Sequence, residues 1–170
     1  MVLLVAASCK KAVEDVLSTE IPVKDQSVTF VLQPANANEA PARVKAESEE
    51  VLYDGVLKIN IAAELESRGF SFENIKSFLI TQGTLEETTP DGFDMKGFIG
   101  AKLYFDNRDQ LVAKVDKVEK GIARFTIVNP QLLDKLENDE LHIILVGVRP
   151  SIQLKLTLKM DYLVKVSLIK

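Results

Sequence analysis

Three residue types that often carry chemistry or recognition are scarce in this 170-residue chain, which has one cysteine, one histidine and no tryptophan. A single cysteine excludes an internal disulfide framework and a zinc site built from several cysteines. A single histidine excludes metal sites with several histidine ligands. The 21 basic residues stand against 25 acidic ones, a net charge of -4, so the chain lacks the basic surface that nucleic-acid binding requires. We therefore expect no cofactor and no nucleic-acid partner.

Hydrophobic residues, by contrast, make up 46% of the chain. A chain of this length buries roughly 70% of its unfolded surface, which suits one folded domain and excludes wholesale disorder. Apart from the N-terminal segment there is no apolar run to consider as a membrane span, and even that segment is shorter than the roughly 20 residues a spanning helix needs.

The first nine residues, MVLLVAASC, form an apolar run that ends in small residues directly before Cys9. Such a run is typical of the hydrophobic region and cleavage site of a secretory signal peptide. The stretch Ala6-Ala7-Ser8-Cys9 resembles the lipobox of a bacterial lipoprotein, and the sequence SCKK is similar to lipoproteins of the Bacteroidota kind. The resemblance implies that Cys9 is lipidated. It also implies that residues 1–9 are a truncated lipoprotein signal peptide whose true start codon lies upstream.

The resemblance further implies a location. In such lipoproteins, acidic residues directly after the lipidated cysteine resemble a signal for export to the cell surface. Here Lys10 and Lys11 occupy those places, so we expect a lipid anchor in the outer membrane with the protein facing the periplasm. The alternative is that residues 2–7 form a buried first strand and that Cys9 is an ordinary small core residue.

Most of the chain after the N-terminus alternates between β-branched or aromatic stretches and turns. The clearest alternation runs from Ile152 to Leu168, and its period of two is typical of a half-buried antiparallel strand. Roughly eight or nine such strands, separated by turn signals, predict a mainly β fold: an antiparallel two-sheet β-sandwich, immunoglobulin-like or jelly-roll-like, with one or two short helices. We assign the sandwich to residues 27–170 and a tether to residues 10–26. The strand pattern resembles the immunoglobulin-like sandwiches common in small Bacteroidota lipoproteins.

Residues suited to catalysis occur without a catalytic pattern. His142 lies in the most apolar predicted strand, and no G-x-S-x-G motif accompanies it, so we interpret it as a strand residue rather than a general base. Carboxylates cluster only in predicted turns, where Asp favours local backbone hydrogen bonds; these are Asp91 with Asp94, Asp106 with Asp109, and Glu137 with Asp139 and Glu140. We predict no catalytic residues and no enzyme.

Two features remain as candidate binding sites. Phe70, Phe72 and Phe93 lie in connections between strands, where they either plug the ends of the fold or form a small exposed ligand-binding edge. Asp106 and Asp109 offer oxygen ligands at short spacing, but the loop lacks the order of a calcium-binding loop, so we assign no metal.

Together these features predict a non-enzymatic, lipid-anchored envelope protein with a binding or structural role. Its expected partners are the membrane, through the lipid, and an envelope protein or a glycan. The alternative is a carbohydrate-binding or adhesin-type module that uses its hairpin loops. An exposed aromatic cluster, or a metal at Asp106 and Asp109, would favour that alternative.

Overall fold

The computed structural model describes residues 18–34 and 49–168. Cys9, the predicted signal peptide and residues 10–17 of the predicted tether lie outside the described residues. Within the described part there are eight strands, one α-helix and three short 3-10 helices. The strands are β1 (Ser18–Leu32), β2 (Glu50–Lys58), β3 (Ile75–Thr89), β4 (Lys102–Phe105), β5 (Ala113–Glu119), β6 (Ile122–Ile127), β7 (Glu140–Gly147) and β8 (Leu154–Ser167). The helices are α2 (Ile61–Ser67), η1 (Phe72–Asn74), η2 (Met95–Phe98) and η3 (Leu133–Lys135).

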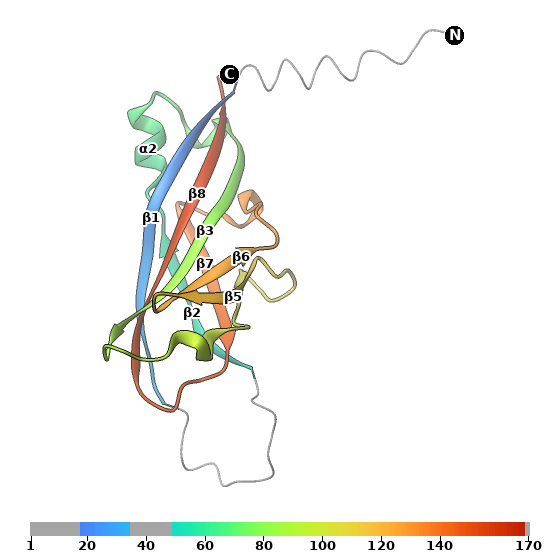
Figure 1. Cartoon of the computed structure of the whole chain (residues 1–170). Coiled ribbons are helices and arrows are strands. Elements are labelled where there is room, and N and C mark those ends of the chain that lie inside the picture. The colour runs from blue at the N-terminus through green and yellow to red at the C-terminus, as the bar shows by residue number, and fades with distance from the viewer. Residues whose placement is uncertain (1–17, 35–48, 169–170) are drawn as a thin grey trace.

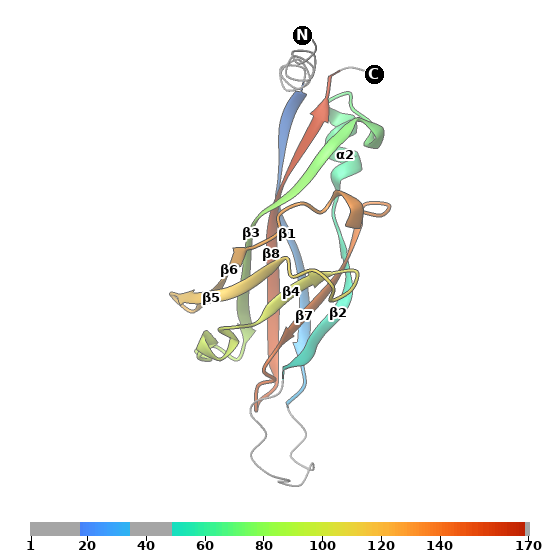
Figure 2. The ribbon, with the colours of Figure 1, turned by 90° about the vertical axis from the view of Figure 1, so that its right-hand side faces the viewer.

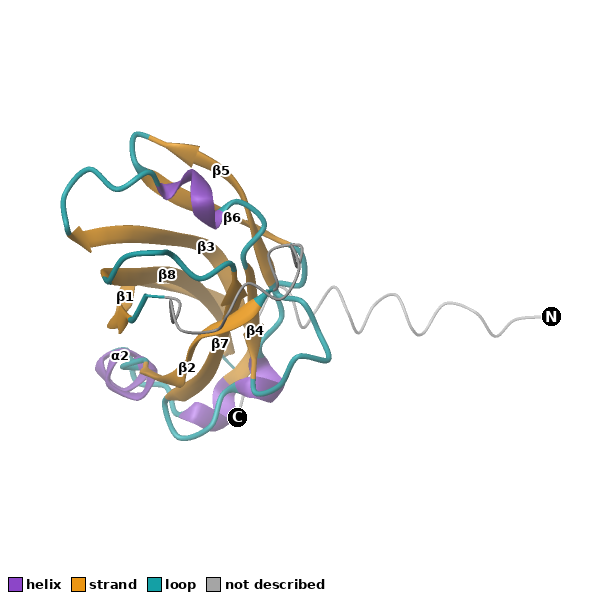
Figure 3. Cartoon of the chain, turned by 90° about the horizontal axis from the view of Figure 1, so that it is seen from below, coloured by secondary structure: helices purple, strands orange, loops and turns teal. Residues whose placement is uncertain are grey.

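All eight strands belong to one antiparallel sheet in the order β1-β8-β3-β6-β5-β4-β7-β2. The sheet curls until its two edge strands, β1 and β2, face each other (Figure 3). In the described part of the chain no hydrogen-bonded ladder joins β1 to β2. The rings of Phe30 and Tyr53 stack across this seam with their centroids 4.5 Å apart, and Arg149 donates to the backbone oxygens of Gln33 and Val51. The sheet is therefore nearly closed into a barrel.

The predicted two-sheet β-sandwich is wrong, because the hydrogen bonding never separates into two sheets. The three longest strands, β1, β3 and β8, have 15, 15 and 14 residues and pair side by side along most of their length. The ladder continues from β3 into β6 through residues 84–86, and then through β5 and β4 to β7. Long strands in a twisted sheet coil, which lets a single sheet close on itself.

The long strands run from one end of the molecule to the other, and β5 and β6 cross them obliquely (Figures 1 and 2). Strand β1 begins at Ser18, so residues 18–26 of the predicted tether belong to the sheet. Within this stretch Ile21 and Val23 face the core. Pro22 fits here because β1 is an edge strand, where a missing N–H need not break a ladder.

Side chains fill the inside of the barrel. The even-numbered residues of β8 from Leu154 to Val166 are at most 1% exposed, and the ring of Tyr162 stacks on Phe78 with a centroid separation of 4.8 Å. Burial raises the pKa of the Tyr162 phenol well above its ordinary value. An eight-stranded barrel has an interior just wide enough for such packing. We therefore expect a functional site on the solvent-exposed outer face of the sheet.

Two β-bulges lie at the same level on either side of β8. The register of β1 against β8 shifts between Val23 and Gln26, and the register of β3 against β8 shifts between Ile80 and Gln82. Both shifts fall next to Asp161, near the middle of β8. Because a bulge bends its strand and increases the local twist, the sheet bends at Asp161.

Candidate functional site

A charged cavity of about 240 Å³ opens on the outer face of the sheet at this bend. Strands β1, β3, β6 and β8 all contribute to its lining. Among its polar residues are Thr84, Glu86, Arg124 and Lys159, with Asp161 at the bulge. The cavity is smaller than the roughly 300–1,000 Å³ of pockets for drug-sized ligands, so it has room for one small polar group.

The bulges hold Asp161 from both flanking strands. Asp25 on β1 has a positive φ of 57°, and its N–H donates to Oδ1 of Asp161 at 2.9 Å. On β3, the hydroxyl of Thr81 donates to the backbone oxygen of Asp161 at 3.1 Å. Asp is among the few residues besides Gly that tolerate such a φ. The bulges therefore hold the backbone of Asp25 against the carboxylate of Asp161, and both residues line the cavity.

Both cations of the cavity already have carboxylate partners. Lys159 Nζ donates to Glu86 Oε2 at 2.6 Å. Arg124 Nε forms an ion pair with Glu119 Oε2 at 2.8 Å. Beneath these side chains Thr84 is only 7% exposed, although it lies on the outer face.

The charged residues that line the cavity determine the net charge that a ligand would meet. Three carboxylates line the cavity, from Asp25, Glu86 and Asp161, and two cations, from Arg124 and Lys159. Their sum is a net charge of −1, that is, two positive minus three negative. The cavity therefore suits a neutral or cationic group with hydrogen-bond donors, such as a hydroxyl or an amine, better than an anion.

His142 lies on β7 with both ring nitrogens engaged. Its Nε2 lies 2.6 Å from Oδ1 of Asp54 on β2, and its Nδ1 lies 3.1 Å from the backbone oxygen of Asp106. Both partners are acceptors, so both ring nitrogens donate and the charged imidazolium is favoured. The hydrogen bond to Asp54 is the main cause that raises the pKa of His142; partial burial opposes the rise, and the carbonyl of Asp106 adds to it. In this arrangement neither nitrogen is left to accept a proton.

A second cavity, of about 140 Å³, lies beside His142 and includes Asp106, Lys135 and Glu140 in its lining. Several of its charged groups are paired as well. Lys135 Nζ lies 3.5 Å from Oδ2 of Asp106, and Glu140 pairs with Lys58 at 3.5 Å. The residues that the structure describes contain no group of three or more His, Cys, Asp or Glu side chains suited to a metal ion.

Two of the other predicted turn carboxylates, those of Asp94 and Asp139, accept backbone N–H groups. Oδ1 of Asp94 accepts the N–H of Lys96 at 3.1 Å and begins η2. Both carboxylate oxygens of Asp139 accept the N–H of Ala62 at the start of α2, at 3.0 and 3.1 Å. The role of Asp139 could not be read from the sequence, because 77 residues separate it from Ala62.

The three phenylalanines predicted in connections lie at different places. Phe70 packs against the core beside α2, and Phe93 packs against the core after β3. Phe93 also meets Phe98 edge to face, with centroids 6.1 Å apart. Phe72 is 38% exposed. The structure therefore does not bring the three together into one aromatic cluster.

The residues of the bend cavity carry no sequence motif. Glu86, Arg124 and Lys159 come from three strands that are distant in the chain, and only the pairing of β3 with β6 and β8 brings them together. Lys159 is one of the polar residues that alternate with apolar ones in the clearest predicted strand. This pattern predicts that its side chain is solvent-exposed, but it does not predict a cavity.

No helix formed by the described residues combines the length and the apolarity that crossing a bilayer requires. Comparisons of the chain with protein-family models, with curated proteins and with solved structures find no match.

Proposed function

We propose that this chain is a non-enzymatic, lipid-anchored protein of a bacterial cell envelope that binds a small polar group in the cavity at the bend of its sheet. The observation that carries the non-enzymatic part is His142, the chain's only histidine. A general base near neutral pH is most often a histidine with an accessible lone pair. With Nε2 on Asp54 and Nδ1 on the carbonyl of Asp106, His142 joins segments of the fold instead.

The lipid anchor is supported by the apolar run and small residues that precede Cys9. Each buried CH₂ contributes about 0.8 kcal/mol, so two or three acyl chains would hold the protein at a membrane essentially permanently. By the same resemblance, Lys10 and Lys11 favour the periplasmic side of the outer membrane.

The binding role is supported by the paired charges over Thr84. Small polar ligands are fixed by a few well-placed donors and acceptors. Asp25 and Asp161 line the cavity and bring carboxylate acceptors, and Lys159 brings N–H donors. A hydroxyl or amino group of a glycan fits this set. The use of the hairpin loops by a carbohydrate-binding or adhesin-type module stays an alternative, which the second experiment below tests.

The first experiment tests the anchor. The protein is expressed from its full gene beside a Cys9→Ala variant, the cells are fractionated, and the mass of the mature N-terminus is measured. We expect a membrane-bound protein that begins at an acylated Cys9, and release of the Cys9→Ala variant. A soluble protein that keeps Met1 would overturn the anchor.

The second experiment tests the cavity. Isotope-labelled Cys9→Ala protein is titrated with glucosamine and N-acetylglucosamine, and its amide resonances are followed by NMR. We expect shifts at Gln82, Thr84 and Arg124 that Lys159→Gln weakens, whereas Lys114→Gln, an exposed lysine on β5, leaves them unchanged. Shifts confined to residues 106–110 would favour the hairpin-loop alternative, and no shifts with either sugar would count against a glycan ligand.

A further inference from the structure

The end of the barrel at which the described chain begins carries two exposed apolar side chains. Phe72 is 38% exposed and begins η1, directly before β3. Leu168 is 53% exposed and follows the last residue of β8. Isolated apolar residues are common on protein surfaces. The exposure of these two side chains is therefore ordinary, and it is their shared position that distinguishes them.

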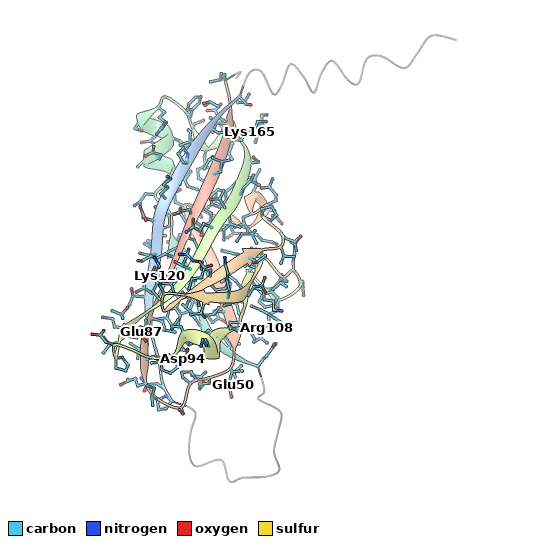
Figure 4. All side chains as sticks on the ribbon, in the orientation of Figure 1. Glu50, Glu87, Asp94, Arg108, Lys120 and Lys165 are labelled. Carbon is cyan, nitrogen blue, oxygen red and sulfur yellow. The ribbon has the colours of Figure 1, made fainter. Side chains whose placement is uncertain are left out.

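The strand register places them at one end. Ser18, the first residue of β1, pairs with Ser167, which directly precedes Leu168. Ile75, three residues after Phe72, pairs with Val166. Figure 1 shows the start of β1, the end of β8 and α2 together at this end. In Figure 4 Lys165 lies near it, whereas Glu50, Glu87 and Asp94 lie toward the other end.

The proposed lipid is attached close to the same end. Eight residues separate Cys9 from Ser18, and even a fully extended chain of that length spans only about 30 Å. An acyl group on Cys9 would therefore keep Phe72 and Leu168 near the bilayer surface. The opposite end, with the turn from β7 to β8, would point away from the membrane.

We infer that this end of the barrel is a membrane-contacting face, in which Phe72 and Leu168 enter the boundary between headgroups and acyl chains. The inference rests on the proposed lipid anchor. Amphipathic and apolar side chains at an interface bind by burying apolar area. A lipid anchor makes even a small contact effective, because it turns insertion into an intramolecular event.

The charges of this end indicate the kind of bilayer. Among the described residues at this end, the acidic ones are Glu20, Glu64, Glu66 and Glu73, and the basic ones are Arg68, Lys76 and Lys165. Three positive minus four negative charges leave −1, so attraction to anionic lipids is not expected to drive the contact. We therefore expect insertion into zwitterionic phosphatidylcholine, without a gain when anionic lipid is added.

The absence of tryptophan from the chain makes insertion directly measurable. Phe72→Trp introduces a single fluorophore at the proposed face. Ile152→Trp is the matched control, because Ile152 is similarly exposed, at 43%, and lies between β7 and β8 at the opposite end. Each acylated full-length protein is reconstituted into phosphatidylcholine vesicles with brominated acyl chains. We expect a blue shift and about twofold quenching for Phe72→Trp, and neither for Ile152→Trp.

Further variants separate this contact from folding and from the anchor. Leu168→Asp in the Phe72→Trp protein should remove most of the quenching, while circular dichroism shows an intact fold. Acylated protein in which Phe72→Trp and Ile152→Trp behave alike would overturn the membrane face and leave the anchor standing. If mass spectrometry instead finds no acyl group on Cys9, the anchor fails, and the non-acylated proteins are added to the same vesicles. Quenching of Phe72→Trp alone would still support the face, and no quenching would overturn it.

Discussion

The imidazole of His142 on β7 donates to the carboxylate of Asp54 on β2 across a diagonal of the sheet, because the register places Val56, not Asp54, opposite His142. Strand β2 is an edge strand that pairs only with β7. The Nδ1 atom of the same ring reaches the carbonyl of Asp106, in the loop after β4. One side chain therefore joins an edge strand, its neighbour and a loop, and it does so best when it is charged.

His142→Gln should destabilise the protein in a pH-dependent way. The folded state raises the pKa of His142 above its unfolded value of about 6.5. The stabilisation is therefore fully present below that unfolded value and is lost as the pH rises through the folded pKa. Both side chains are partly exposed, so we expect a loss of about 0.5 to 1 kcal/mol at pH 5.5. Urea unfolding at pH 5.5 and pH 8.5 measures it.

Asp54→Asn is the companion variant for this pair, because it keeps the shape and removes the charge. It should lose stability over the same pH window. A destabilisation by His142→Gln that grows toward pH 8.5 would contradict the charged form of the ring.

Phe78→Ala should be among the most damaging single changes in the core. Phe78 is fully buried and stacks on Tyr162, and truncating a buried phenylalanine costs about 3–5 kcal/mol. Tyr162→Phe is the mild comparison, because the phenol donates only to the thioether sulfur of Met160, at 3.4 Å, so its loss should cost under about 1 kcal/mol. Chemical denaturation should show a loss of unfolding free energy for Phe78→Ala at least twice that for Tyr162→Phe. Equal losses would contradict the packing.

Gly147→Val should destabilise by overpacking. A Cβ at Gly147 would lie 3.0 Å from Leu52 Cδ1 and 3.2 Å from Ala101 Cβ. Forcing extra atoms into such a site costs about 1–3 kcal/mol. Gly97→Ala is the control, since a Cβ there meets nothing within 4 Å. Thermal unfolding should show a clear decrease in Tm for the first variant only, and an unchanged Tm for Gly147→Val would mean that the contact is looser than described.

Asp139→Ala should weaken the start of α2. The carboxylate accepts the N–H of Ala62, and removing a side chain that satisfies a helix N-terminus costs about 1 kcal/mol. Asp139→Asn keeps an acceptor and should lose less. Hydrogen exchange of the Ala62 and Ala63 amides, followed by NMR, gives a local readout. If Asp134→Ala, at an exposed residue outside this contact, had the same effect on those amides, the assignment of the cap would fail.

The sequence predicted the local secondary structure of much of this protein. The alternation from Ile152 to Leu168 predicts one wet and one buried face, and β8 has these faces, because side chains of a strand point alternately to its two sides. The mainly β, antiparallel character followed from the same period. Residues 18–26 were assigned to a tether rather than to a strand, because Pro22 favours a break in regular structure, but a proline is tolerated in an edge strand.

Which strands pair, and which distant residues meet, was decided only by the tertiary structure. A sandwich and a curled single sheet bury one face of each strand in the same way, so the period of two is common to both. Asp54 and His142 are 88 residues apart in the chain. Residues of four strands line the bend cavity, which lies at β-bulges that no residue pattern predicts. Such sites depend on register and on the curvature of the whole sheet. Those are set by the joint packing of the core, whereas the sequence by itself determined which residues belong to that core.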